Sequence, residues 1–123
     1  IILVEDDIFV SEAWKIQVKD APVLIYSRPE LLLQFLENHF LHYKAVPAIG
    51  YIIVDQYYEN SDTLGTELCT KLVNWFQQKK AQTPSIFIST NAILKPEAIP
   101  KNIQGVLDKR PYSSAELNLI ASN

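Results

Sequence analysis

The chain has 123 residues, a formal net charge of −3 and a single cysteine, with 48% hydrophobic and 20% charged residues. This composition is typical of one globular domain with its own core, and the acidic balance argues against a nucleic-acid-binding surface. No apolar stretch approaches the ~20 residues that span a bilayer, and one cysteine excludes an internal disulfide, so we expect a cytoplasmic domain without membrane contact. Because the chain opens on a strand-like run without an initiator methionine, we expect residues 1–123 to be a single domain excised from a longer protein.

The first part of the chain predicts two strand–helix units. Ile1-Ile2-Leu3-Val4 is typical of a short buried parallel strand, and Asp7 can cap a helix over residues 8–18. Residues 23–26 predict a second strand. Ser27-Arg28-Pro29-Glu30 is typical of a helix start, with Ser27 as the cap and Glu30 reaching back. The predicted inward face of this helix holds Leu32, Phe35, Leu36, His39 and Phe40.

The second part continues the alternation. Tyr51-Ile52-Ile53-Val54 predicts a third buried strand that ends at Asp55, and a polar loop leads to a helix over residues 65–80. Residues 85–89 predict a fourth strand, and Pro96 and Pro100 exclude one long helix after it. Residues 105–107 predict a short fifth strand, and Ser113-Ser114-Ala115-Glu116 is a capping box that starts a last helix.

Strand and helix patterns that alternate in this way indicate an α/β domain with a mostly parallel sheet. In such sheets ligands bind outside the carboxyl ends of the strands, where the strand order reverses. The residues that follow the predicted strands are therefore the first candidates for a functional site.

Carboxylates follow two of these strands. Glu5, Asp6 and Asp7 come directly after the first strand, and Asp55 ends the third. Carboxylates at neighbouring strand ends repel one another in a partly dry crevice, and a divalent cation relieves that repulsion. An Asp beside such a cation can act as a nucleophile. The other strand ends contribute polar side chains, namely Ser27, Ser89, Thr90 and Lys109.

In chain order these residues resemble the response-regulator receiver domain, the phospho-accepting module of two-component and phosphorelay signalling. The resemblance covers essentially the whole chain and rests on Glu5-Asp6 after Leu3-Val4, Asp55 after Ile52-Ile53-Val54, Gly65-Thr66-Glu67-Leu68, Ser89 five residues after Pro84, and Leu107-Asp108-Lys109. It implies a doubly wound, flavodoxin-like (βα)5 sandwich. Its parallel strands would run in the order 2-1-3-4-5, with a short or irregular fourth helix.

The resemblance also implies a chemistry. Asp55 would take a phosphoryl group from a phosphohistidine on a sensor histidine kinase or a histidine phosphotransfer protein. Mg²⁺ would be held by Asp6, Asp55 and the backbone carbonyl of Tyr57, with Glu5 acting through a water molecule. Lys109 would contact one phosphoryl oxygen, and the hydroxyl of Ser89 would donate to another as the conformational switch. Such a domain is not an enzyme, apart from phosphotransfer and autodephosphorylation on its own Asp.

Two neighbouring residues compete for the role of switch hydroxyl. The spacing from Pro84 favours Ser89, with Thr90 as the alternative. Adjacent strand residues point to opposite faces, so only one of the two can serve. His39, His42 and Cys69 lie on or near predicted helices away from the acidic strand ends, so we expect no part for them in the site.

The chain departs from the receiver pattern in four places. The loop between Asp55 and Gly65 is longer than usual and lacks its common proline, and Arg110 separates Lys109 from Pro111. Val106 stands where many receivers carry Tyr or Phe, and the fourth-helix region is short. We therefore expect a domain that is phosphorylated but passes its signal differently from transcription-factor receivers, as in a hybrid kinase or phosphorelay.

Other functions make different demands on the sequence. A pseudo-receiver, which binds partners without phosphorylation, is the main alternative, and Mg²⁺ binding near Asp55 would distinguish the two. A phosphatase of the haloacid dehalogenase type needs a second Asp where this chain has Tyr57. A flavin site needs a phosphate-binding loop after the first strand, where this chain has carboxylates.

Overall fold

The computed structural model of the chain describes residues 1–122, in which strands and helices alternate from the first residues to the last. The strands are β1 (Ile2–Val4), β2 (Leu24–Tyr26), β3 (Tyr51–Asp55), β4 (Ser85–Ser89) and β5 (Gly105–Leu107). The helices are α1 (Ile8–Gln17), α2 (Pro29–Tyr43), α3 (Gly65–Gln78) and α4 (Ser114–Ala121), with a short 3-10 turn, η1 (Pro96–Ala98), between β4 and β5. The predicted bounds of β4 and β5 are confirmed, and the other predicted bounds match or differ by at most two residues.

All five strands run parallel in one sheet, in the order β2-β1-β3-β4-β5. This confirms the predicted α/β fold and its strand order. The order reverses between β1 and β3, which pair in register with Val4 opposite Val54. The carboxyl ends of these two central strands therefore lie side by side, and the chain continues from them into Glu5 and Asp55.

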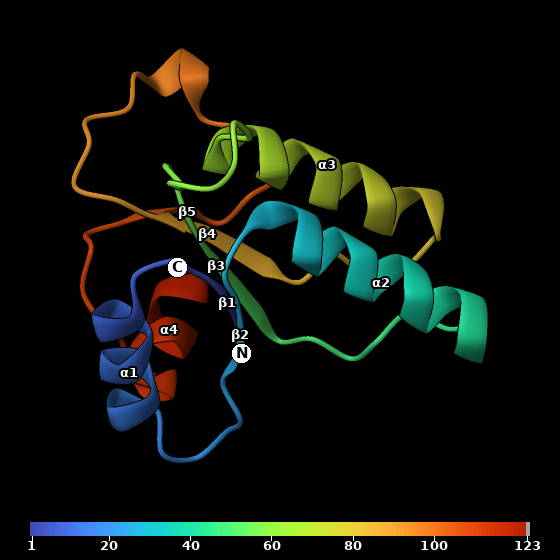
Figure 1. The fold of residues 1–123 in the computed structure, drawn as a ribbon, viewed down its shortest axis with the longest axis horizontal. Coiled ribbons are helices and arrows are strands. Elements are labelled where there is room, and N and C mark those ends of the chain that lie inside the picture. Colours follow the sequence, from blue (N-terminus) through green and yellow to red (C-terminus); the bar gives the residue numbers. More distant parts are fainter. Residues whose placement is uncertain (123) are drawn as a thin grey trace.

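Helices cover both faces of the sheet, with α2 and α3 on one side and α1 and α4 on the other (Figure 1). Successive strand side chains point to opposite faces, so each strand feeds two buried clusters. Ile52 and Val54 pack with Leu36, Leu72 and other residues beneath α2 and α3. Ile53 and Phe87 pack with Trp14 and Leu117 beneath α1 and α4. This double burial explains why the strands read as unbroken apolar runs.

Two of the three predicted helix caps are confirmed. The side chain of Asp7 accepts a hydrogen bond from the Phe9 amide at the start of α1. Ser113 and Glu116 form the predicted capping box of α4. The prediction for α2 is wrong, because the helix begins one residue later: Arg28 is the N-cap without a side-chain bond, and Pro29 occupies the first turn. Ser27 therefore lies outside the helix, and Glu30 turns to other partners.

The connection between β4 and β5 holds only the η1 turn, which confirms the predicted short or irregular fourth helix. Figure 1 shows η1 projecting from the body beside the start of α3. Pro96 opens the turn and Pro100 follows it, and neither can donate a helical hydrogen bond. In residues 1–122 no helix has the length and apolar character needed to cross a membrane.

Candidate functional site

A crevice of about 500 Å³ opens at the carboxyl ends of the central strands. Its walls come from the residues after β1, the loop after β3, the residues after β4 and Lys109 after β5. The lining residues are Glu5, Asp6, Asp7, Asp55, Tyr57, Tyr58, Glu59, Thr90, Asn91, Ala92 and Lys109. The structure thus brings together most of the residues that the sequence places at strand ends. Ser27, after the edge strand β2, does not line the crevice.

The predicted carboxylates form one cluster. Glu5, Asp6 and Asp55 each offer an oxygen, and these atoms lie within 4.8 Å of one another. Glu5 and Asp55 are buried and Asp6 is half-buried. The cluster follows from the fold, because β1 and β3 are paired neighbours whose next residues are these acids.

Lys109 neutralises part of this negative charge. Its Nζ donates to Asp55 Oδ2 at 2.7 Å and lies 3.4 Å from Glu5 Oε1. Burial works to lower the pKa of Lys109, but the hydrogen bond to Asp55 and the charge of Glu5 outweigh it and raise the pKa. The lysine therefore stays a cation between two carboxylates.

Glu5 is the carboxyl group most changed by its surroundings. Burial, the largest influence, and the nearby charge of Asp55 raise its pKa from 4.5 to about 7. The Asp7 amide, which donates to Glu5 Oε2 at 3.1 Å, and Lys109 act in the opposite direction. Near neutral pH the cluster thus has a carboxyl group that readily releases its proton to solvent when a cation binds.

The carboxylate oxygens of the cluster suit a hard divalent cation, and backbone amides hold two of the carboxylates in place. Asp6 Oδ2 accepts the Glu59 amide at 2.7 Å, and Asp55 Oδ1 accepts the Gln56 amide at 2.7 Å. Both bonds fix the direction of a carboxylate. Mg²⁺ takes oxygen ligands, needs only one or two carboxylates and keeps several waters. An all-carboxylate donor set at the open end of a crevice fits that demand, and the residues present could hold Mg²⁺.

The two candidate switch hydroxyls are placed differently. Thr90 lines the crevice, its amide donates to the Leu107 carbonyl, and its Oγ1 accepts the Ala92 amide at 3.1 Å. Ser89 does not line the crevice, and its hydroxyl faces the Asp108 carbonyl at 3.5 Å. The alternative residue, Thr90, therefore stands at the site, although the spacing from Pro84 favours Ser89.

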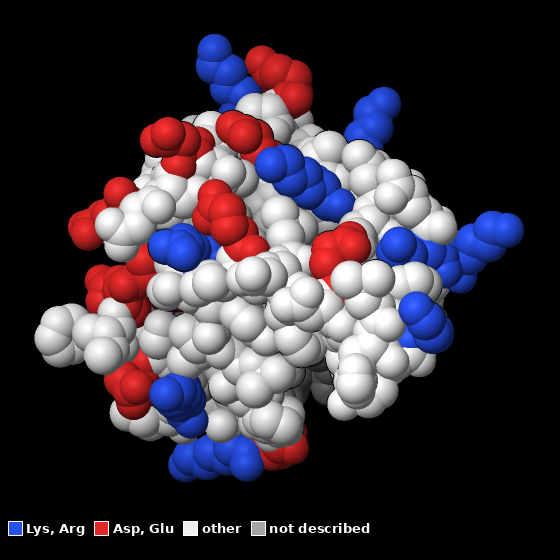
Figure 2. Space-filling model, turned by 45° about the vertical axis from the view of Figure 1, so that its right-hand side comes forward, with Lys and Arg blue, Asp and Glu red and all other residues white. Residues whose placement is uncertain are grey.

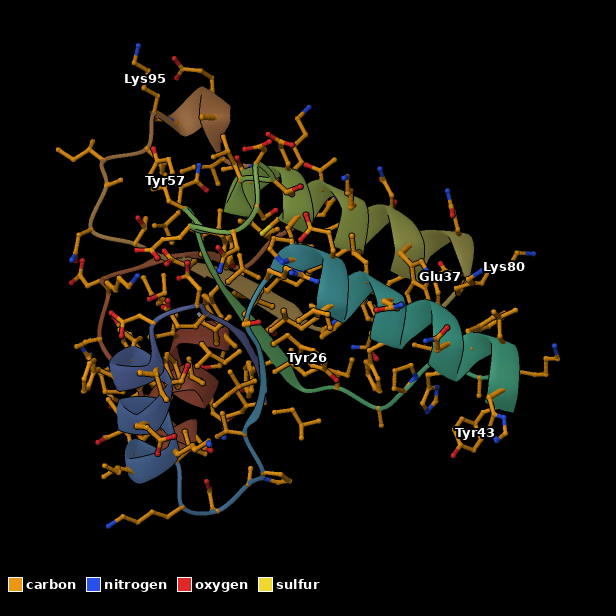
Figure 3. The ribbon with its side chains drawn as sticks, viewed as in Figure 1. Tyr26, Glu37, Tyr43, Tyr57, Lys80 and Lys95 are labelled. Carbon is orange, nitrogen blue, oxygen red and sulfur yellow. The ribbon has the colours of Figure 1, made fainter. Side chains whose placement is uncertain are left out.

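Tyr57 and Tyr58 also take different positions, which their sequence does not distinguish. Tyr57 is exposed, and Figure 3 shows it where β3 leads into the loop before α3. Tyr58 is buried, and its hydroxyl donates to the Val4 carbonyl at 3.0 Å. Two consecutive tyrosines in a polar loop carry no local signal for which one turns inward.

Gln56 is a further residue that sequence reasoning does not single out. It is buried, and its side-chain oxygen accepts the Thr66 amide at 2.9 Å. Its backbone carbonyl accepts the Gly65 amide at 2.8 Å. The residue after Asp55 is thereby tied to the first turn of α3, so the helix start helps to hold the candidate nucleophile in place.

The residues expected to take no part do lie elsewhere. His39 faces the Ala45 carbonyl at the far end of α2, and neither His39 nor His42 lines the crevice. Figure 3 shows Tyr43 and Lys80 at that same distant end of α2 and α3. Cys69 is buried in the core, and burial raises the pKa of its thiol to about 12, so it is an unreactive packing residue.

Charge is distributed without a dominant sign over the visible surface. On the face drawn in Figure 2, acidic side chains lie mainly toward the left and the charged side chains toward the right are mainly basic, among larger uncharged areas, and no continuous basic stripe is seen there. Comparison of the chain with models of protein families, with curated proteins and with solved structures finds no match.

Proposed function

We propose that this chain is a phospho-accepting receiver domain that takes a phosphoryl group onto Asp55 in a Mg²⁺-dependent reaction. The observation that carries the proposal is the arrangement of Asp55 with two further carboxylates and a lysine at the reversal point of a parallel sheet. The donor would be a phosphohistidine on a sensor histidine kinase or a histidine phosphotransfer protein. The setting would be cytoplasmic signal transduction, in a hybrid kinase or a phosphorelay.

In this reaction an Asp55 carboxylate oxygen attacks the phosphorus of the phosphohistidine. The new O–P bond forms as the P–N bond breaks, and the imidazole leaves with the electron pair of that bond. Mg²⁺, when bound, offsets the charge of the carboxylates and of the phosphoryl oxygens. Asp6, Asp55 and the Tyr57 carbonyl are the proposed ligands, with Glu5 acting through a water molecule.

Lys109 has two tasks in this proposal. In the free domain its Nζ donates to Asp55 Oδ2, which fixes the direction of the nucleophile at the crevice. Once Asp55 carries the phosphoryl group, the same Nζ would pair with a phosphoryl oxygen. Because Lys109 also approaches Glu5, it can change partner without leaving a carboxylate uncompensated.

Thr90 is the better candidate for the switch hydroxyl, because it stands in the crevice. Its Oγ1 already accepts the Ala92 amide at the start of the connection to η1. A hydroxyl that turns toward a phosphoryl oxygen would break that bond and let the connection move. This would be a route for the signal to leave the site.

The test is intact mass after incubation with Mg²⁺ and acetyl phosphate. We expect one added phosphoryl group (~80 Da) that requires Mg²⁺ and is lost under mild alkali, as an acyl phosphate is. Asp55→Asn should abolish it, and Asp62→Asn should not, since Asp62 is an exposed Asp in the same loop.

If both variants label as the wild type does, another residue is the acceptor and the proposal is wrong. If the wild type is never labelled by acetyl phosphate or by a phosphohistidine donor, the phosphoacceptor role is wrong, and if it also fails to bind Mg²⁺ the pseudo-receiver alternative takes its place. That alternative keeps the fold and the crevice for partner binding without phosphorylation.

A further inference from the structure

The loop between β3 and α3, residues 56–64, is hydrogen-bonded to the end of β1 through two successive residues. The Tyr58 hydroxyl donates to the Val4 carbonyl at 3.0 Å. The Glu59 amide donates to Asp6 Oδ2 at 2.7 Å. Both partners belong to the segment that carries the acidic pair Glu5-Asp6, so the loop holds the backbone before the pair and one side chain within it.

The same loop is fastened to the first turn of α2. The Ser61 hydroxyl donates to Glu30 Oε1 at 2.5 Å, and the Thr63 hydroxyl reaches the same oxygen at 3.3 Å. The Ser61 hydroxyl also accepts the Thr63 amide at 3.1 Å. These bonds lower the pKa of Glu30, so the carboxylate remains an acceptor at neutral pH. A short antiparallel bridge joins Tyr58 to Ser61, and it links the hydrogen bonds to the end of β1 with the hydrogen bonds to α2.

We propose that this loop positions Asp6 for the divalent cation and couples occupancy of the acidic cluster to the first turn of α2, with Tyr58 and Ser61 as positioning residues. The inference rests on the cation site of the proposed function. It goes beyond that function because cation binding would also stabilise the bonds between the loop and the first turn of α2, on the sheet face opposite α1 and α4.

The physical reason is preorganisation. Asp6 is half-buried and lines the crevice, and the bond from the Glu59 amide to one of its oxygens fixes the direction of its carboxylate. A carboxylate held in this way loses less conformational freedom when it ligates an ion. If the α2 end of the loop is released, the Glu59 amide is less well held and the advantage is lost.

Coupling of this kind is reciprocal. The free energy that the ordered loop adds to cation binding equals the free energy by which the bound cation stabilises the loop and its bonds to Glu30. Hydrogen exchange of the loop amides should therefore slow when the cation binds. A merely structural role for Ser61 would leave cation affinity unchanged.

The experiment measures Mg²⁺ affinity by isothermal titration calorimetry on the whole chain. Ser61→Ala and Tyr58→Phe each remove one hydroxyl from the loop without changing the net charge. We expect each to weaken Mg²⁺ binding about three- to tenfold, and amide exchange at residues 58–61 to speed up.

Two matched variants serve as controls. Ser122→Ala removes an exposed hydroxyl that donates to the Leu119 carbonyl, and Tyr51→Phe removes a hydroxyl that bonds Asn118, at the opposite end of β3. Both should bind Mg²⁺ with wild-type affinity.

Wild-type affinity in both loop variants, or a wild-type chain that does not bind Mg²⁺, would overturn the coupling. The acetyl phosphate experiment separates this from failure of the proposed function. If Asp55 is phosphorylated but the loop variants bind Mg²⁺ with wild-type affinity, only the coupling is wrong. If the loop variants bind Mg²⁺ more weakly but the wild type is not phosphorylated, only the phosphoacceptor role is wrong.

Discussion

Glu5 lies buried at the end of β1, and the ammonium group of Lys109 lies between its carboxyl group and that of Asp55. A carboxylate is solvated far better in water than at this buried position, so folding favours the protonated form of Glu5 relative to the unfolded chain. The lysine recovers part of the lost solvation but is shared with Asp55. The residue is therefore a destabilising element of the cation-free protein at neutral pH.

This environment predicts a pH dependence of stability without added metal. The pKa of Glu5 is about 7 in the folded chain against an ordinary 4.5, so between these values only the folded state holds the proton. The free energy of unfolding should therefore fall as the pH rises through this window. Glu5→Gln cannot ionise, so it should equal the wild type near pH 5 and exceed its stability near pH 8 by about 1–3 kcal/mol.

Urea denaturation in EDTA at the two pH values measures this difference. The exposed Glu12→Gln serves as the control, and its difference from the wild type should not change with pH in the same way. A Glu5→Gln variant that is less stable than the wild type near pH 8 would contradict the account, since it would mean that the ionised form is the better accommodated one.

At the scale of elements, the junction of β3 and α3 is the tightest point of the site. Gly65 opens α3, and a Cβ placed there would lie 2.2 Å from the Asp55 carbonyl oxygen and 2.9 Å from the Gln56 Cα. Both are backbone atoms that cannot move without shifting the candidate nucleophile. Only glycine lets the helix start approach the strand end this closely.

Gly65→Ala should therefore destabilise the fold by about 1–3 kcal/mol and lower the yield of Asp55 phosphorylation, because the added methyl group pushes α3 away from β3. Gly50→Ala is the matched control, since a Cβ at Gly50 meets nothing within 4 Å. Its free energy of unfolding should stay within about 0.5 kcal/mol of the wild type. Denaturation curves and labelling yields of both variants check the prediction, which fails if Gly65→Ala behaves like Gly50→Ala.

At the scale of the whole molecule, one sheet separates two apolar layers. Trp75 belongs to the cluster beneath α2 and α3, and Trp14 to the cluster beneath α1 and α4. Each central strand contributes side chains to both clusters, so neither layer can unfold while the sheet keeps its packing. We expect one cooperative transition, as in most single domains of this size.

Truncation in either layer should therefore have the same kind of effect. Leu36→Ala in α2 and Leu117→Ala in α4 each empty a fully buried position and should cost about 2–5 kcal/mol of stability. Leu41→Ala and Leu119→Ala, at side chains exposed by 65% and 67% on the same two helices, should cost less than about 1 kcal/mol.

Denaturation followed separately at Trp14 and Trp75, through Trp→Phe variants, should give coincident curves. Separate midpoints would show that the layers unfold independently.

The sequence by itself determined the fold class, most element bounds and the acidic cluster. Apolar runs, helix periodicity, capping residues and prolines act within a few residues of chain, so their signals are local. The burial of Leu32 and Leu36, the capping box at Ser113 and the irregular segment around Pro96 all follow from such signals. The strand order then brings Glu5 and Asp55 together, because the two strands that end in carboxylates are neighbours in the sheet.

Only the tertiary structure decided which of two adjacent residues faces the crevice, and what Glu30 and Tyr58 contact. The choices between Ser89 and Thr90 and between Tyr57 and Tyr58 depend on where a strand ends relative to its neighbours, which local pattern does not specify. Ser27 is not the cap of α2, because the chain enters the helix one residue later. The Tyr58 hydroxyl reaches a carbonyl 54 residues away. Contacts of that range are set by packing, and the positioning of the site is therefore a property of the folded molecule.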